Sequence, residues 1–110
     1  MSNTRRAREA LIARILAGDG SAPHAQRRAA FENAELGEPL STLIDKVAMH
    51  APAISDADIT AVRAAGLTED QTFEVVVCAA VGQAARQYDS AFAALDSAIE
   101  RSGDAPRKPR

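Results

Sequence analysis

The sequence has few aromatic residues and a single cysteine. Aromatic side chains make up 4% of the 110 residues, tryptophan is absent, and alanine supplies much of the apolar content. A core of such small side chains buries little apolar area, at roughly 25 cal/mol of stabilisation per Å². We therefore expect self-association to add burial that one copy lacks. The lone Cys78 excludes an internal disulfide and fits a reducing compartment, so we expect a cytoplasmic protein.

The sequence also lacks a strong net charge and a long apolar run. Its net charge is −2, whereas generic nucleic-acid binding depends on a strong positive field. The basic clusters at 5–8 and 107–110 are interpreted as solvated, partly disordered ends. No apolar run approaches the roughly 20 residues of a membrane span, and no signal-peptide core follows the basic start. We expect neither a nucleic-acid nor a membrane partner.

The apolar pattern predicts one all-α domain without strands. Residues 5–17 form an amphipathic helix, and the signal is weak from 18 to 39, where a helix beginning at Pro23 is possible. The predicted divisions are an N-terminal helix and weakly structured linker over 1–39, a helical core over 40–101, and a flexible basic tail over 102–110. The helix that opens the core has its apolar residues on one face. That face consists of Leu40, Leu43, Ile44, Val47 and Ala48.

Explicit start and stop signals divide residues 54–101 into two helices. Ser55 is predicted to cap the first helix, with Asp58 completing a capping box. Gly66 is the expected left-handed residue that ends it. Thr68 then caps the second helix, and Gln71 completes a second capping box.

The second helix is too long for one copy to cover. From 68 to 101 it would extend about 50 Å at roughly 1.5 Å per residue, beyond the size of a compact chain of this length. It must either break, most plausibly near Gly82, or be covered by a second copy. Apolar residues at alternating steps of three and four favour a covered helix. The predicted interface comprises Cys78, Val81, Gly82, Ala85, Tyr88, Phe92, Leu95 and Ile99.

Few residues in the sequence are candidates for catalysis or metal binding. Cys78 has no CxxC partner and no basic neighbour one turn away, so a structural thiol with a raised pKa is expected. His24 and His50 lack the spacing of metal ligands, and no cofactor-binding motif is present. Glu74 and Arg86 lie on a largely apolar helix and are too far apart along it to pair with each other. The weak catalytic candidates are Cys78, Glu74 and His50.

Residues 40–95 resemble the C-terminal half of the carboxymuconolactone decarboxylase / alkylhydroperoxidase D-like family. The matching positions are 55–58 (SDAD), 64–67 (AAGL) and 74–76 (EVV), and Arg86 lies where the family has an arginine, although Ala85 replaces its asparagine. The resemblance implies a small all-α bundle with a long alanine-rich C-terminal helix, assembled into oligomers. The CxxC and histidine of the family's peroxidases are absent, so their catalytic residues are not carried over.

The leading hypothesis is a non-catalytic, oligomeric helical subunit or accessory protein that acts by protein–protein association, with its own copies or with a second protein. The alternative is a thiol-dependent alkylhydroperoxidase or a lyase that uses Cys78 or a site between subunits. A third hypothesis is a helix-turn-helix regulator over 59–77. Two features argue against this third hypothesis. Its recognition helix would begin with Glu69 and Asp70, whose negative charges repel DNA phosphates, and it would expose valine side chains to solvent.

Overall fold

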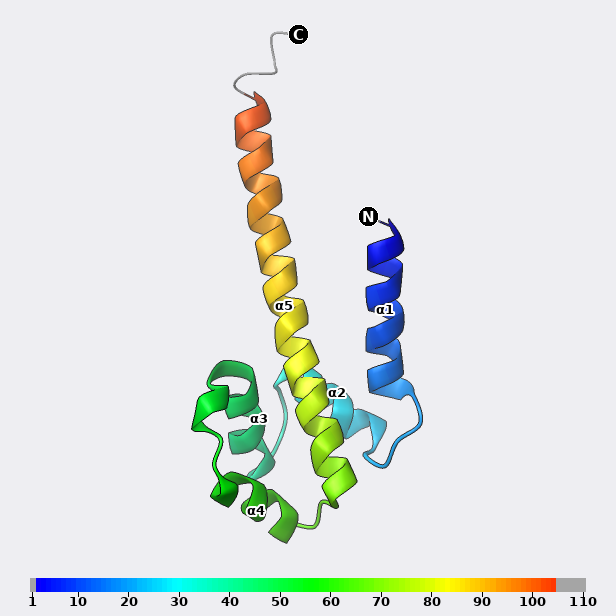
Figure 1. The fold of residues 1–110 in the computed structure, drawn as a ribbon, viewed down its shortest axis with the longest axis vertical. Coiled ribbons are helices and arrows are strands. Elements are labelled where there is room, and N and C mark those ends of the chain that lie inside the picture. Colours follow the sequence, from blue (N-terminus) through cyan, green and yellow to red (C-terminus); the bar gives the residue numbers. More distant parts are fainter. Residues whose placement is uncertain (1, 105–110) are drawn as a thin grey trace.

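A computed structural model describes residues 2–104, and these residues form an all-helical structure without strands (Figure 1). The all-α prediction is confirmed. In chain order the elements are α1 (Ser2–Ala17), α2 (His24–Glu32), α3 (Leu40–Met49), the 3₁₀ turn η1 (Ala51–Ala53), α4 (Asp56–Ala64) and α5 (Glu69–Asp104). No helix within 2–104 has the length and apolar character needed to cross a bilayer.

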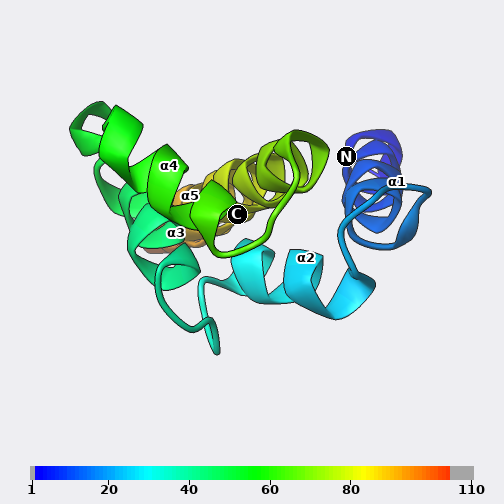
Figure 2. The same ribbon diagram turned by 90° about the horizontal axis from the view of Figure 1, so that it is seen from below.

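The long helix α5 is the axis of the molecule. The helices α2, α3 and α4 gather around its first half, α1 runs antiparallel beside its middle, and its second half projects beyond α2, α3 and α4 (Figure 1). Seen along α5, α2 lies beneath it, α3 and α4 lie on one side, and α1 lies on the other (Figure 2). The extents are 65 × 29 × 20 Å and the radius of gyration is 18.2 Å, against about 13 Å for a compact chain of this size.

The two predicted capping boxes are present. The Ser55 hydroxyl accepts a hydrogen bond from the Asp58 backbone N–H, and the Asp58 carboxylate accepts one from the Ser55 backbone N–H. Thr68 and Gln71 make the same reciprocal pair, at 3.0 and 3.1 Å. Gly66 has a φ of 115°, a conformation that costs glycine least. These three features set the turn between α4 and α5.

The buried face of α3 also agrees with the sequence. Leu40, Leu43, Ile44 and Ala48 are buried, and Val47 is half-buried against them. The Lys46 ammonium adds an ion pair from α3 to Asp58 of α4, at 2.8 Å. The ion pair and the shared apolar contact hold α3 and α4 as a unit at the base of α5.

The segment with the weakest sequence signal contains a well-formed helix. Pro23 immediately precedes α2, and Asn33 ends it in the left-handed conformation, with φ at 53°. Ala30 of α2 is fully buried, and the core takes members from Leu16 to Ala79, on both sides of position 39. Residues 18–39 are therefore more than a linker, because α2 packs against α5 and contributes to the core.

The ends of the chain differ in part from expectation. Residues 5–8 lie within α1, in agreement with the helix predicted over 5–17, and Arg5 and Arg6 are exposed as expected, whereas this segment is not disordered and Arg8 is half-buried. At the other end, α5 continues through 102–104, and the rest of the predicted basic tail, 105–110, lies outside the described residues. Over its 36 residues α5 is unbroken at Gly82. There the glycine lets α2 approach α5 closely, since a β-carbon would collide with the backbone of Phe31.

Candidate functional site

Cys78 lies where α1, α2 and α5 meet. It is buried, and its Sγ is 3.8 Å from the carbonyl oxygen of Ile15 at the end of α1. Burial raises the pKa of the Cys78 thiol; the Arg27 guanidinium partly opposes this shift and the Glu74 carboxylate adds to it. A thiol held protonated is a poor nucleophile. The predicted structural role of Cys78 agrees with this environment.

Arg27 is a buried cation that the sequence analysis did not single out. Its Nε donates to the carbonyl oxygen of Ala22 at 3.0 Å, and one of its terminal nitrogens donates to that of Ile15 at 3.1 Å. It thereby joins the end of α1, the following loop and α2. The sequence offers no signal for this role, because Arg28 beside it has the same chemistry and is exposed.

Glu74, on α5, binds the loop between α1 and α2. Its two carboxylate oxygens accept hydrogen bonds from the backbone N–H groups of Ser21, at 2.9 Å, and Ala22, at 2.7 Å. These two bonds lower the pKa of the Glu74 carboxyl, with Arg27 contributing in the same direction. A carboxylate so held is a weak base, so Glu74 anchors the loop and is poorly suited to proton transfer.

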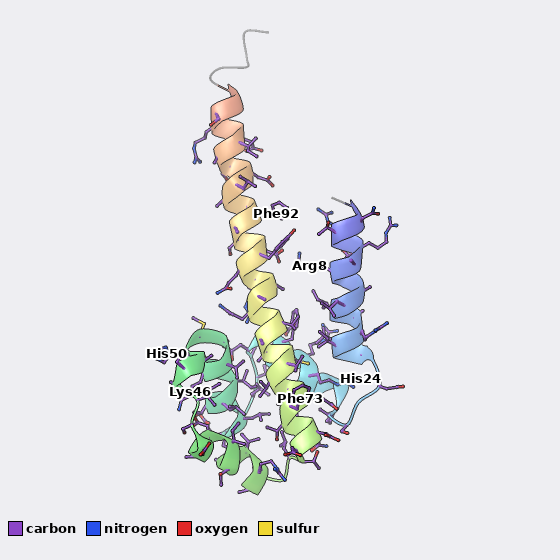
Figure 3. All side chains as sticks on the ribbon, in the orientation of Figure 1. Arg8, His24, Lys46, His50, Phe73 and Phe92 are labelled. Carbon is purple, nitrogen blue, oxygen red and sulfur yellow. The ribbon has the colours of Figure 1, made fainter. Side chains whose placement is uncertain are left out.

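A shallow pocket of about 170 Å³ opens beside these residues, and Phe73 and Asp19 also line it. His50, the third catalytic candidate, is exposed at the end of α3, on the other side of α5 from α1 (Figure 3). The structure therefore brings Cys78 and Glu74 together and leaves His50 apart. Across residues 2–104 no group of three or more metal-ligating side chains is assembled.

The predicted interface residues divide into two groups along α5. Cys78 and Gly82 are buried within a single copy, and Val81, Ala85 and Phe92 are half-buried. The other three are exposed on the projecting half of α5. Their exposed fractions are 40% for Tyr88, 51% for Leu95 and 49% for Ile99. The interface through these residues remains a prediction.

A groove of about 440 Å³ separates the start of α1 from the middle of α5, and both charged and aromatic side chains line it. Arg8 reaches across it to α5 (Figure 3), where its guanidinium lies 2.9 Å from Asp89 and 5.2 Å from the centre of the Tyr88 ring. Tyr88 in turn meets Phe92 edge-on, with ring centres 4.9 Å apart. Arg8 thus joins α1 to α5 through an ion pair and a cation–π contact.

A second hollow, of about 460 Å³, lies between α2, the segment before α3 and the end of α4. Its titratable lining residues are Glu35 and Glu38. Glu38 accepts hydrogen bonds from the backbone N–H and hydroxyl of Thr42 at the start of α3. The hollow contains no nucleophile or basic side chain among the residues that line it, so it offers little for catalysis.

Comparison of the chain with protein-family models, with curated proteins and with solved structures gave no match in any of the three.

Proposed function

We propose that the protein is a non-catalytic helical subunit or accessory protein that acts by protein–protein association through the projecting half of α5. The observation that carries the proposal is the exposure of Tyr88, Leu95 and Ile99 on a helix that extends beyond its own core. Together with Phe92, these residues repeat at steps of four, three and four, the spacing of a helix–helix seam. Soluble proteins usually cover such a surface.

The environment of Cys78 supports a non-catalytic role. Its thiol is buried and its pKa raised, while the Glu74 carboxylate is already committed to two backbone N–H groups. The alternative, a thiol-dependent peroxidase or a lyase, draws on the pocket of about 170 Å³ beside Cys78. That alternative requires a base from another subunit and a movement that exposes the sulfur.

The resemblance to the carboxymuconolactone decarboxylase / alkylhydroperoxidase D-like family is part of the same proposal. It covers residues 40–95 and rests on positions 55–58, 64–67, 74–76 and Arg86. The capped pair of helices α4 and α5 lies within this range. We also propose a cytoplasmic location, because the one cysteine is a free thiol. Association with copies of the same chain is the simplest form of the proposed function.

Light scattering on the purified protein tests this function. At micromolar concentration we expect a mass that is a multiple of the 11.6 kDa chain. Leu95→Glu places a charge in the seam and should return the mass to that of the monomer while the circular dichroism spectrum stays helical. Ser97→Glu, at an exposed position on the opposite side of α5, is the matched control. A monomer mass for the unmodified protein at high concentration would contradict self-association.

A further inference from the structure

We infer that the partner of α5 is the α5 helix of a second copy, running antiparallel along nearly its whole length. In this arrangement the projecting half of each α5 covers the first half of the other. The inference rests on the proposed function and specifies its partner, orientation and register. The inference is drawn from an apolar surface of α5 that extends from the predicted interface toward the start of the helix.

Much of this surface lies on the side of α5 that the other helices leave open. Figure 1 views α5 from that side, with α2 behind it, and Figure 2 shows α1 and α4 flanking it. Phe73, at the start of α5, is 69% exposed, the largest exposed fraction among the large apolar residues of the described chain. Val77, Ala80 and Ala84 follow it at helical spacing and are exposed or half-buried. We call the combined surface the open face; its members are Phe73, Val77, Ala80, Ala84, Tyr88, Phe92, Leu95 and Ile99. Phe73 and Val77 also line the pocket beside Cys78, and Tyr88 and Phe92 also line the groove against α1.

The spacing of the open face is the same read in either direction. From Phe73 the successive steps are four, three and four residues to Ala84, then four to Tyr88, then four, three and four to Ile99. A two-fold contact requires residue i to meet residue j while j meets i. With the axis near position 86, each member of the open face meets another member on the partner. This symmetry favours an antiparallel copy of the same helix over an unrelated protein.

Side-chain size is complementary near the centre of this register. Tyr88 and Phe92, the two aromatic residues there, face the partner's Ala84 and the partner's Ala80. Toward the ends the pairs are apolar on both sides, since Leu95 faces the partner's Val77 and Ile99 faces the partner's Phe73. Large residues opposite small ones allow two helices to pack closely without voids. A parallel pair would instead place Phe92 against the partner's Phe92 and alanine against alanine, which alternates crowded and empty layers.

Charge supports the same pairing. None of the eight members of the open face is charged. The Arg8 guanidinium that lies over the Tyr88 ring is already paired with Asp89 of the same copy. The acidic residues Asp89 and Asp96 lie at the edge of the face toward α1, in the groove that also contains Arg5 and Arg8. An antiparallel pair further brings the negative end of one α5 beside the positive end of the other, which is favourable.

Phe73 provides the decisive substitution. Since its side chain is largely exposed in a single copy, Phe73→Glu should leave the protomer folded. We expect light scattering at micromolar concentration to fall from twice 11.6 kDa to 11.6 kDa. The matched control is Met49→Glu, because Met49 is 68% exposed but lies on α3, away from the open face. The control should keep the mass of the dimer.

Distances between spin labels test the orientation without altering the open face. Asp70 and Gln87 are exposed on α5 and are replaced, one at a time, by labelled cysteine in a Cys78→Ala background. At 1.5 Å per residue, the antiparallel register places the two labels at position 70 roughly 50 Å apart along the helix, while those at position 87 lie within about 20 Å. A parallel pair would bring both sets within about 30 Å, since packed helices are about 10 Å apart.

The outcomes separate this inference from the proposed function. A dimer that persists in Phe73→Glu, or labels at position 70 that lie close together, would overturn the antiparallel open-face dimer and leave association through the projecting half intact. A protein that is monomeric at all concentrations would overturn both the antiparallel dimer and self-association through the projecting half. Loss of the dimer in Phe73→Glu with the two expected distances in the labelled variants would support both.

Discussion

The carbonyl oxygen of Phe31 occupies the place where a β-carbon on Gly82 would have to lie. The absence of a side chain at this one position of α5 allows the end of α2 to contact the backbone of α5 directly. The same carbonyl oxygen accepts a hydrogen bond of 2.6 Å from Arg86, about one turn further along α5. Gly82 and Arg86 together hold the end of α2 close against α5.

Gly82→Ala should therefore destabilise the protein, although alanine is the better helix former by about 1 kcal/mol. The new methyl group meets backbone atoms that cannot rotate away, so we expect a net loss of about 1–3 kcal/mol in the free energy of unfolding. Chemical denaturation measures this loss. Gly37→Ala is the matched control, since nothing lies within 4 Å of a β-carbon there. An unchanged midpoint in Gly82→Ala would show that α2 does not rest on this glycine.

Arg86→Ala should leave the Phe31 carbonyl oxygen without its charged donor. A hydrogen bond to a charged group contributes about 1.5–3 kcal/mol, and we expect a loss in that range by thermal or chemical unfolding. Arg101, exposed near the end of α5, supplies a control of the same residue type. If Arg86→Ala and Arg101→Ala are equally stable, the bond to Phe31 contributes nothing measurable.

Glu74 should make stability depend on pH in the acid range. Its pKa is lowered in the folded protein by the backbone N–H groups of Ser21 and Ala22 and by Arg27. Its stabilisation is thus complete above the unfolded pKa of about 4.3 and is lost as the pH falls through the lower folded pKa. Unfolding curves between pH 2 and 7 should show Glu74→Gln less stable than the native protein at neutral pH.

The difference between Glu74→Gln and the native protein should then shrink as the solution becomes more acidic. Glu9→Gln is a control on α1, because Glu9 is exposed and outside this cluster. A gap that is constant over the whole pH range would argue that the charge of Glu74 has no part in holding the loop.

Cys78 should react slowly with a thiol reagent in the folded protein. The sulfur is buried and its raised pKa keeps it protonated at neutral pH, so labelling requires unfolding or local opening. Rates measured from pH 6 to 9, with and without denaturant, test this expectation. Cys78→Ala should cost a modest amount of stability and leave association unchanged. Fast native labelling with a midpoint well below about 8.5 would instead favour the enzymatic alternative.

Local signals in the sequence were sufficient for the helix boundaries around the α4–α5 turn and for the buried face of α3. The Ser55–Asp58 and Thr68–Gln71 pairs and the left-handed Gly66 depend only on residues within one turn of each other. Interactions of such short range form with the same partners in almost any tertiary setting. Periodicity likewise identified the apolar side of α3, because that helix has a single buried face.

The sequence alone did not determine which side of α5 is covered. Apolar residues occupy most of the circumference of its first half, so periodicity predicted a seam through Cys78 and Gly82. Both of these residues are buried against α1 and α2, while Phe73 is left exposed. The same limit explains Arg27 and Arg28, neighbours of identical chemistry of which only one is buried. Contacts of α5 with segments more than 50 residues away decide which side of α5 is covered. Arg27 is held by Ala22 and Ile15, 5 and 12 residues away, and nothing in the sequence within one helical turn specifies either set of partners.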